Sequence, residues 1–176
     1  MDLDSRHPQQ AENEPDDYGA ALYAASAAGV QVDLIIRGIC CLKVGIPGVS
    51  ENIHVRSIVG NYLEHARIFY FENDGKPEYY CASADWMPRN LDRRVEIMFP
   101  ILSEAIFARL KSILQTYLDD TENTSVLNSD GTWTQLSSLK KKEKVEFSAQ
   151  EYFYKKAHKQ EKSQKENLTG EFIVRR

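Results

Sequence analysis

The chain has 176 residues and a mass of 20.1 kDa, enough for one domain that buries a real hydrophobic core. Its formal net charge of −4 argues against a broadly cationic nucleic-acid binder, and no apolar run approaches the roughly 20 residues that cross a bilayer. Three cysteines without a CxxC pair predict neither a disulfide framework nor a zinc site, and they fit a cytoplasmic protein.

The distribution of charge divides the sequence into three parts. Residues 1–17 carry a net charge of −5, residues 18–136 a net charge of −4 and residues 137–176 a net charge of +5. The first part is polar and contains two prolines, which predicts a disordered leader. Nearly all apolar periodicity lies in the second part, so we expect one folded module at 18–136. The third part is expected to be a Lys-rich extension that is partly helical.

The first half of the module predicts a helix, a strand and a second helix. Residues 18–28 are Ala-rich and precede Gly29, which is typical of a helix with a glycine C-cap. Residues 30–36 (VQVDLII) are apolar and rich in valine and isoleucine, and they predict a strand buried on both faces. A loop rich in glycine follows. Apolar residues in 55–64 then recur at helical spacing and predict a short helix.

The second half predicts a hairpin, a further strand and a long helix. Residues 68–71 and 78–83 flank the segment ENDGKP, whose Asp-Gly pair is a strong hairpin signal. Residues 95–99 predict another strand. After Pro100, apolar residues repeat at steps of three and four as far as Tyr117, which predicts an amphipathic helix. Strands that alternate with helices indicate the α/β class.

Arginine is frequent in the centre of the module, and its planar fork of donors matches phosphate oxygens. Arg37 is the most informative, because it follows an apolar strand directly, at the end where open α/β sheets place their ligands. For any other single arginine, surface solvation or pairing with a carboxylate is the simpler interpretation. The arginines of this centre, with two histidines between them, are Arg37, His54, Arg56, His65, Arg67, Arg89, Arg93 and Arg94.

His65 ends the helix predicted at 55–64 and precedes a strand. A histidine with an ordinary pKa of about 6.5 suits proton transfer or contact with a phosphate. At a helix C-terminus it can equally act as a partner of the helix dipole. The residues alone leave both roles open, but they exclude some chemistry, since the sequence contains no GxxxxGK[ST], GxGxxG or GxSxG motif.

Two long stretches resemble the last catalytic domain of bacterial polyphosphate kinases, the enzymes that build inorganic polyphosphate from ATP. One is DLIIRGICCLKVGIPGVSENI at 33–53, and the other, within 57–96, includes SIVGNYLEHARIFYFENDG and SADWMPRNLDRRVE. The resemblance covers about residues 20–118 and touches 147–157. It implies a phospholipase D-like domain with a mixed sheet flanked by helices and with disordered or extended termini. It also implies that the chain is part of a much longer enzyme, cut inside its final domain.

The resemblance further implies roles for two residues. The histidine of this domain falls on His65, which would contact the nucleotide phosphates and protonate the leaving oxygen, and the arginine that holds the ATP phosphates falls on Arg37. The covalent phosphohistidine and the Mg²⁺-associated positions belong to upstream domains, so no metal ligand is expected here. ATP, ADP and polyphosphate are the implied ligands. The complete enzyme is expected to be a homo-oligomer, and the isolated fragment is expected to be inactive.

Two other functions stay open at this stage. A non-catalytic anion-binding module would bind its ligand without turnover. A phospholipase D-like phosphodiesterase would pair two copies of His65, although Arg67 occupies the lysine position of that family's HxK motif and argues against it. Four nearby residues either orient the histidine or act as caps and turn residues, with equal weight on both interpretations: Ser83, Asp85, Asn90 and Glu96.

Overall fold

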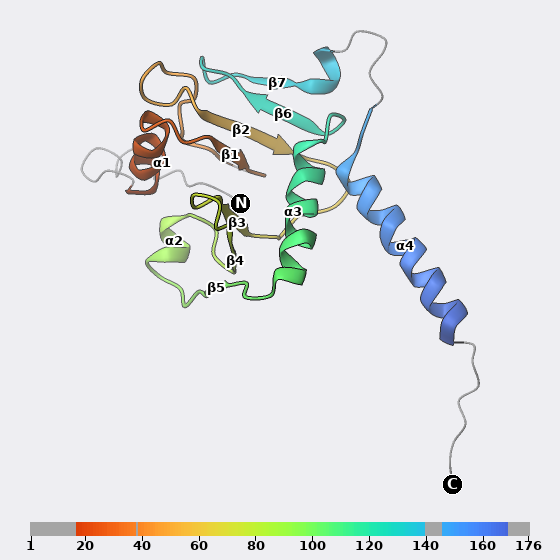
Figure 1. Ribbon diagram of the computed structural model, residues 1–176. Helices are drawn as coiled ribbons and strands as arrows, with labels where there is room; N and C mark the ends of the chain where they lie inside the picture. The colour runs from red at the N-terminus through yellow and green to blue at the C-terminus, as the bar shows by residue number, and fades with distance from the viewer. Residues whose placement is uncertain (1–16, 38, 140–145, 169–176) are drawn as a thin grey trace.

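A computed structural model describes residues 17–37, 39–139 and 146–168 of the chain. The predicted α/β class is confirmed: two β-sheets are surrounded by helices (Figure 1). No helix in these ranges is both long and apolar enough to cross a membrane. The elements are α1 (Asp17–Ala27), β1 (Val32–Ile35), β2 (Ile53–Ile58), β3 (Ile68–Phe71), β4 (Glu78–Ala82), α2 (Pro88–Leu91), β5 (Met98–Pro100), α3 (Glu104–Leu118), β6 (Thr124–Leu127), β7 (Trp133–Gln135), the 3₁₀ helix η1 (Leu136–Leu139) and α4 (Ala149–Leu168).

The larger sheet has the strand order β1-β2-β6-β7 and is mixed. β1 pairs with β2 in parallel, whereas the β2–β6 and β6–β7 pairs are antiparallel. In β2, Ile53 and Val55 are buried and the residue between them is exposed, the alternation that a strand requires when one face covers a core. The core cluster around them consists of Ile36, Leu42, Val44, Ile53, Val55 and Leu127, with Leu22 and Tyr23 of α1 packed against it.

The smaller sheet has the order β3-β4-β5 and contains the predicted hairpin. Its turn is closed by three consecutive residues with positive φ, Asn73, Asp74 and Gly75, a conformation that glycine, asparagine and aspartate tolerate best. Trp86, after β4, stacks on Phe69 of β3 at a centroid distance of 5.4 Å and also packs against the core of the larger sheet. The two sheets therefore share one apolar interior.

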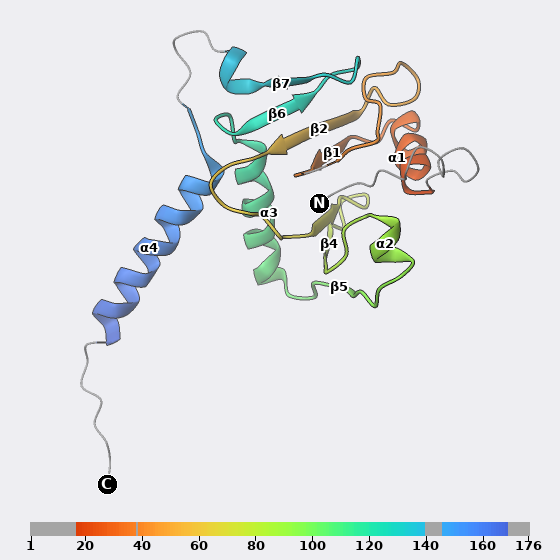
Figure 2. The same cartoon turned by 180° about the vertical axis from the view of Figure 1, so that it is seen from behind.

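α4 begins beside the turn between α3 and β6 and then runs away from the body of the molecule, as both views of the ribbon show (Figures 1 and 2). The buried carboxylate of Asp120 attaches its first turn by accepting the backbone N–H of Ala149 at 2.8 Å. Asn123 adds a hydrogen bond from its side-chain amide to the Ser148 hydroxyl at 2.9 Å. The start of α4 is thus part of the folded body.

The prediction of a helix at 55–64 is wrong. This stretch forms β2 and an irregular loop, in which Val59, Tyr62 and Leu63 are exposed. The apolar residues of a short segment can satisfy both a helical and an alternating pattern, and here the alternation over 53–58 decided the structure. Pairing with β1 and β6 supplies the hydrogen bonds that a helix would otherwise have made.

Other boundaries also differ from the expectations. β1 lies at the edge of its sheet and exposes Asp33, so the strand is not buried on both faces, although Ile36 just after it is fully buried. The last strand of the smaller sheet is shorter and later than predicted, and β6 and β7 were not foreseen. The predicted leader lies almost wholly outside the described residues. The division at 17/18 and 136/137 stays a prediction.

Candidate functional site

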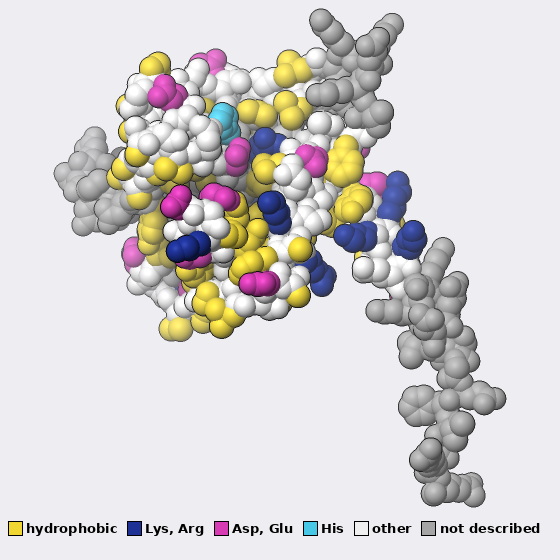
Figure 3. Space-filling view, in the orientation of Figure 1, with side chains coloured by type: hydrophobic (Ala, Val, Ile, Leu, Met, Phe, Trp, Pro, Cys, Tyr) yellow, Lys and Arg dark blue, Asp and Glu magenta, His cyan; other side chains and the backbone are white. Residues whose placement is uncertain are grey.

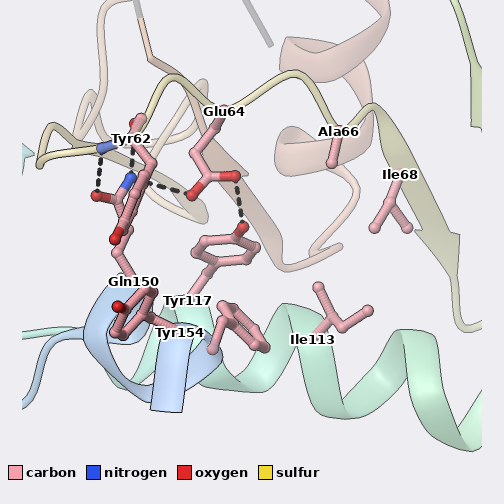
Figure 4. A pocket seen from close by; sticks show the side chains of 9 residues that line it. Tyr62, Glu64, Ala66, Ile68, Ile113, Tyr117, Gln150 and Tyr154 are labelled. Carbon is pink, nitrogen blue, oxygen red and sulfur yellow. Dashed lines mark hydrogen bonds between the residues drawn. The ribbon is translucent and has the colours of Figure 1, made fainter. Parts of the chain in front are cut away.

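His65 lies in an extended segment between β2 and β3, and not at the end of a helix as expected. This position removes the helix-dipole interpretation of its role. Successive side chains of an extended backbone point to opposite sides. Tyr62, Glu64, Ala66 and Ile68 line a single pocket, so the segment has one face turned towards that pocket (Figure 4). The exposed His65, between Glu64 and Ala66, belongs to the opposite face.

Two of the predicted arginines converge on this segment. The Arg37 guanidinium donates a hydrogen bond to the backbone carbonyl of Glu64, the residue directly before His65. Arg67 donates through Nη1 to the His65 carbonyl at 2.9 Å and through Nε to Asp85 Oδ1 at 2.9 Å. Residues from three separate loops are therefore brought together at His65.

The pKa of the Asp85 carboxyl shows the effect of the nearby arginines. Burial raises the pKa of this carboxyl, but the hydrogen bond and charge of Arg67, with smaller contributions from other positive charges that include Arg37, outweigh that effect and hold the pKa below its ordinary value of 3.8. Both arginines therefore act on one carboxylate. The Arg67–Asp85 pair is neutral as a whole, and Arg37 adds a positive charge next to it.

On the opposite face of the segment lies a pocket of about 420 Å³ between this loop, α3 and α4 (Figure 4). The Glu64 carboxylate points into it and accepts hydrogen bonds from the Tyr117 hydroxyl at 2.8 Å and from Gln150 Nε2 at 3.0 Å. The Gln150 side chain also brackets the backbone of Tyr62, accepting its N–H at 2.9 Å and donating to its carbonyl at 2.8 Å.

Tyr117 remains a proton donor in this pocket. Burial, followed by the hydrogen bond and charge of Glu64, raises the pKa of its hydroxyl far above the ordinary value of 10. The hydroxyl therefore stays protonated at neutral pH and can donate to Glu64. Sequence reasoning missed Glu64 and Gln150 and saw Tyr117 only as an apolar helix position. The alternation of 62–68 was the available signal for Glu64, and no local signal pointed to Gln150.

The other basic residues of the arginine-rich centre do not join this cluster. Arg56 donates to the carbonyl of Leu118 at the C-terminus of α3, where a cation stabilises the last turn. His54 lies beside Asp33 at 4.0 Å, and both are exposed. Arg89 lies in α2, and Arg93 and Arg94 lie in the loop after it; these three side chains are exposed too.

Among the four polar residues with open roles, Asp85 is connected to the His65 segment through Arg67. Ser83 donates to Glu96 and accepts the backbone N–H of Ile97 at 3.0 Å, which ties the start of β5 to the end of β4. Asn90 is 3% exposed and donates to the Asp85 carbonyl at 3.4 Å. Ser83 and Glu96 thus make contacts typical of turn residues, whereas Asp85 contacts the arginine that donates to the His65 carbonyl.

A metal site is not formed by the described residues, since they contain no cluster of three or more His, Cys, Asp or Glu side chains that could hold an ion. The Arg37 and His65 cluster instead offers hydrogen-bond donors and one imidazole. Such a set can bind an anion with several oxygens, and an exposed imidazole can exchange a proton with it.

The chain was compared with known proteins. Residues 16–150 match the family model described as "Polyphosphate kinase C-terminal domain 2". The chain is 56% identical to a polyphosphate kinase of Pseudomonas aeruginosa over 117 residues, which is 66% of this chain and 17% of that protein. It is 49% identical to polyphosphate kinase 1 of Chlorobaculum tepidum over 150 residues, which is 85% of this chain and 20% of that protein.

A solved structure is similar as well. The crystal structure of the polyphosphate kinase from Porphyromonas gingivalis superimposes with a TM-score of 0.74 and 37% sequence identity, covering 84% of this chain and 22% of that chain. This likeness agrees with the phospholipase D-like fold expected from the sequence. The chain spans about a fifth of the length of the relatives it matches.

Proposed function

Because the chain belongs to the polyphosphate kinase family, as a C-terminal domain 2, we propose that it forms one wall of a site that transfers phosphoryl groups from ATP to polyphosphate. The observation that carries this proposal is the contact between Arg37 and the backbone directly before His65. A phosphate held by Arg37 would lie within reach of the His65 imidazole. The two residues implied by the resemblance are 28 positions apart in sequence, and the contact supports their action on one ligand.

Each residue has a distinct chemical role in this proposal. Arg37 neutralises the charge of the ATP phosphates, and its fork of donors orients their oxygens. A histidine in an upstream domain attacks the γ-phosphorus, the bond from that phosphorus to the bridging oxygen breaks, and ADP leaves. His65 contacts the phosphates and donates a proton to the leaving oxygen. The phosphoryl group then passes from the upstream histidine to the end of the polyphosphate chain.

The remaining components lie outside this chain. Mg²⁺ would accompany ATP and neutralise phosphate charge, but the described residues offer no acidic ligand set for the ion. The upstream domains supply the nucleophile and the opposite wall, and the complete enzyme would assemble as a homo-oligomer. Dependence on ATP suits the cytoplasm.

A chimera tests this function. The 117-residue matching segment of the Pseudomonas aeruginosa enzyme is replaced by the corresponding segment of this chain, and synthesis of polyphosphate from ATP is measured. We expect Arg37→Ala to lower turnover at least tenfold, because arginines on transferring phosphoryl groups contribute about 10³–10⁵ in rate in other systems. The matched control is Arg109→Ala, on the exposed surface of α3, which should stay within twofold.

Two results would contradict the proposal. One is a chimera with Arg37→Ala that retains the turnover of the unaltered chimera. The other is a folded chimera, intact by circular dichroism, that binds ATP and polyphosphate in a calorimetric titration but makes no polymer. The second result would favour a non-catalytic anion-binding module.

A further inference from the structure

We propose that Gln150, in the first turn of α4, is a positioning residue that determines where His65 projects. It acts through Glu64 and the backbone of Tyr62. The inference rests on the proposed function only for the catalytic role of His65. The hydrogen bonds that support the inference do not depend on a ligand. It makes the C-terminal helix, remote in sequence, a component of the phosphate site.

All of the described hydrogen bonds of the Gln150 side chain are made to two residues of the His65 segment, Tyr62 and Glu64. Its carbonyl oxygen accepts the Tyr62 N–H at 2.9 Å, and its nitrogen donates to the Tyr62 carbonyl at 2.8 Å and to the Glu64 carboxylate at 3.0 Å. The residue is 4% exposed, so water does not compete for these groups. A side-chain amide that pairs with both backbone groups of one residue fixes its position and its orientation.

The approach of Gln150 depends on a glycine. A Cβ atom placed on Gly60 would collide with the Gln150 carboxamide, a contact that real Cβ atoms do not make. Any other residue at position 60 would push the amide away from Tyr62. The loop is therefore shaped to receive this side chain.

Glu64 transmits the constraint to His65. Its carboxylate is held by Gln150 and Tyr117 on the pocket face, and its backbone carbonyl is held by Arg37 on the opposite side. The next residue is His65, whose own carbonyl accepts from Arg67. A shift of the Glu64 backbone would therefore move the imidazole and the Arg37 guanidinium together.

Gln150 is itself held by the body of the protein. Asp120 accepts the backbone N–H of Ala149, and Asn123 donates to Ser148, the two residues before Gln150. Phe153 and Tyr154, in the next turn, still line the pocket. Beyond them, α4 extends away from the fold, with lysine side chains on its visible face (Figure 3). A displacement of α4 would thus reach the His65 segment through Gln150 and through Tyr154, whose ring stacks on that of Tyr62 at a centroid distance of 6.2 Å.

Nuclear magnetic resonance on the 176-residue chain tests the geometry without a ligand. We expect Gln150→Ala to lower the backbone order parameters of residues 62–66 from about 0.85 to below about 0.6, the difference between rigid and flexible backbone. Glu64→Ala should do the same. Glu64→Gln keeps one side-chain oxygen that can accept from Gln150, and its amide nitrogen can donate to the Tyr117 hydroxyl, which can also act as an acceptor, so this variant should retain rigid values. Gln160→Ala, exposed on the same helix, is the matched control.

A destabilised control separates positioning from a merely structural role. Leu127→Ala removes a buried side chain of β6 from the core cluster of the larger sheet, and it should lower the melting temperature while leaving residues 62–66 rigid. Unchanged order parameters in Gln150→Ala would overturn the inference. So would equal mobility in Gln150→Ala and Leu127→Ala.

The functional measurement uses an extended form of the chimera, in which the exchanged segment also includes α4 (Ala149–Leu168). Gln150→Ala, with α4 of this chain included, should lower kcat at least tenfold and change the KM for ATP less than threefold, and Glu64→Gln should retain kcat where Glu64→Ala loses it. A mobile loop with an unchanged kcat would overturn the positioning role. If the unaltered chimera is inactive, the proposed function fails, whereas the order parameters still decide whether Gln150 positions His65.

Discussion

The role of Arg67 follows from the hydrogen-bond partners of its guanidinium. It stands where a phospholipase D-type motif has lysine, and its guanidinium donates to the His65 carbonyl and to Asp85. A lysine ammonium, with one compact donor group, could not span both acceptors in the same planar geometry. We infer that Arg67 supports the backbone of the histidine segment and does not contact a reacting phosphate directly.

The Arg67–Asp85 pair makes stability depend on pH. Folding lowers the pKa of Asp85, so its charged form stabilises the folded state above the ordinary value of 3.8, and this contribution is lost as the pH falls through the lower folded pKa. We expect Asp85→Asn to reduce the free energy of unfolding by about 2 kcal/mol at pH 7. The difference should shrink below about pH 4.

Urea unfolding of both proteins between pH 7 and pH 3 measures this effect. The control is Asp92→Asn, an exposed carboxylate in the loop after α2, which should leave the free energy of unfolding nearly unchanged. A difference between wild type and Asp85→Asn that stays constant down to pH 3 would contradict the ion-pair explanation.

At the scale of elements, the first turn of α4 depends on one buried carboxylate. Asp120 is fully buried and accepts from the Asn123 backbone at 2.8 Å, the Thr124 hydroxyl at 3.0 Å and the Ala149 backbone at 2.8 Å. The last of these is an N-terminal N–H of a helix, a favourable partner for a negative charge. Asp120 therefore joins the end of α3, the start of β6 and the start of α4.

We predict that Asp120→Ala destabilises the protein by about 3 kcal/mol, because it leaves three buried donors without an acceptor. Hydrogen exchange should accelerate first at residues 121–124 and 149–152. Asp119→Ala, at the exposed neighbour that accepts from the Gln115 side chain, should cost less than about 1 kcal/mol. Equal losses in the two variants would show that Asp120 does not connect these elements.

At the scale of the whole molecule, Trp86 connects the two sheets and α1. Its indole stacks on Phe69 of the smaller sheet and on Tyr18 of α1, both at 5.4 Å, and it packs against the core cluster of the larger sheet. The other tryptophan, Trp133 in β7, is 41% exposed. One aromatic side chain thus connects the layers, and the other covers a surface strand.

We predict that Trp86→Ala lowers the free energy of unfolding by about 3 kcal/mol, through lost burial and the cavity left between the sheets. Trp133→Ala should cost about 1 kcal/mol or less. Chemical denaturation followed by far-ultraviolet circular dichroism gives both values, independently of tryptophan fluorescence. Similar losses for the two variants would mean that the sheets do not depend on Trp86.

Local signals in the sequence were sufficient for some elements. The Ala-rich segment before Gly29, the Asp-Gly hairpin and the amphipathic repeat before Tyr117 each contain their own determinants, and the structure has α1, the β3–β4 hairpin and α3 there. The segment 55–64 failed because its apolar spacing fitted two periods, and pairing with strands far along the chain chose between them.

The sequence by itself determined the family and the α/β class, because long motifs and short-range periodicity are properties of contiguous residues. Arg37 and His65, on which the proposed function depends, stay predictions from the resemblance. Only the tertiary structure decided that His65 lies on an extended segment, that Arg37 reaches the backbone before it, and that Gln150, 88 residues from Tyr62, holds that backbone in place. Contacts between residues so far apart in the sequence produce no periodic pattern from which they could be predicted. They arise from the packing of loops and helices against a shared core, and that packing exists only in the folded molecule.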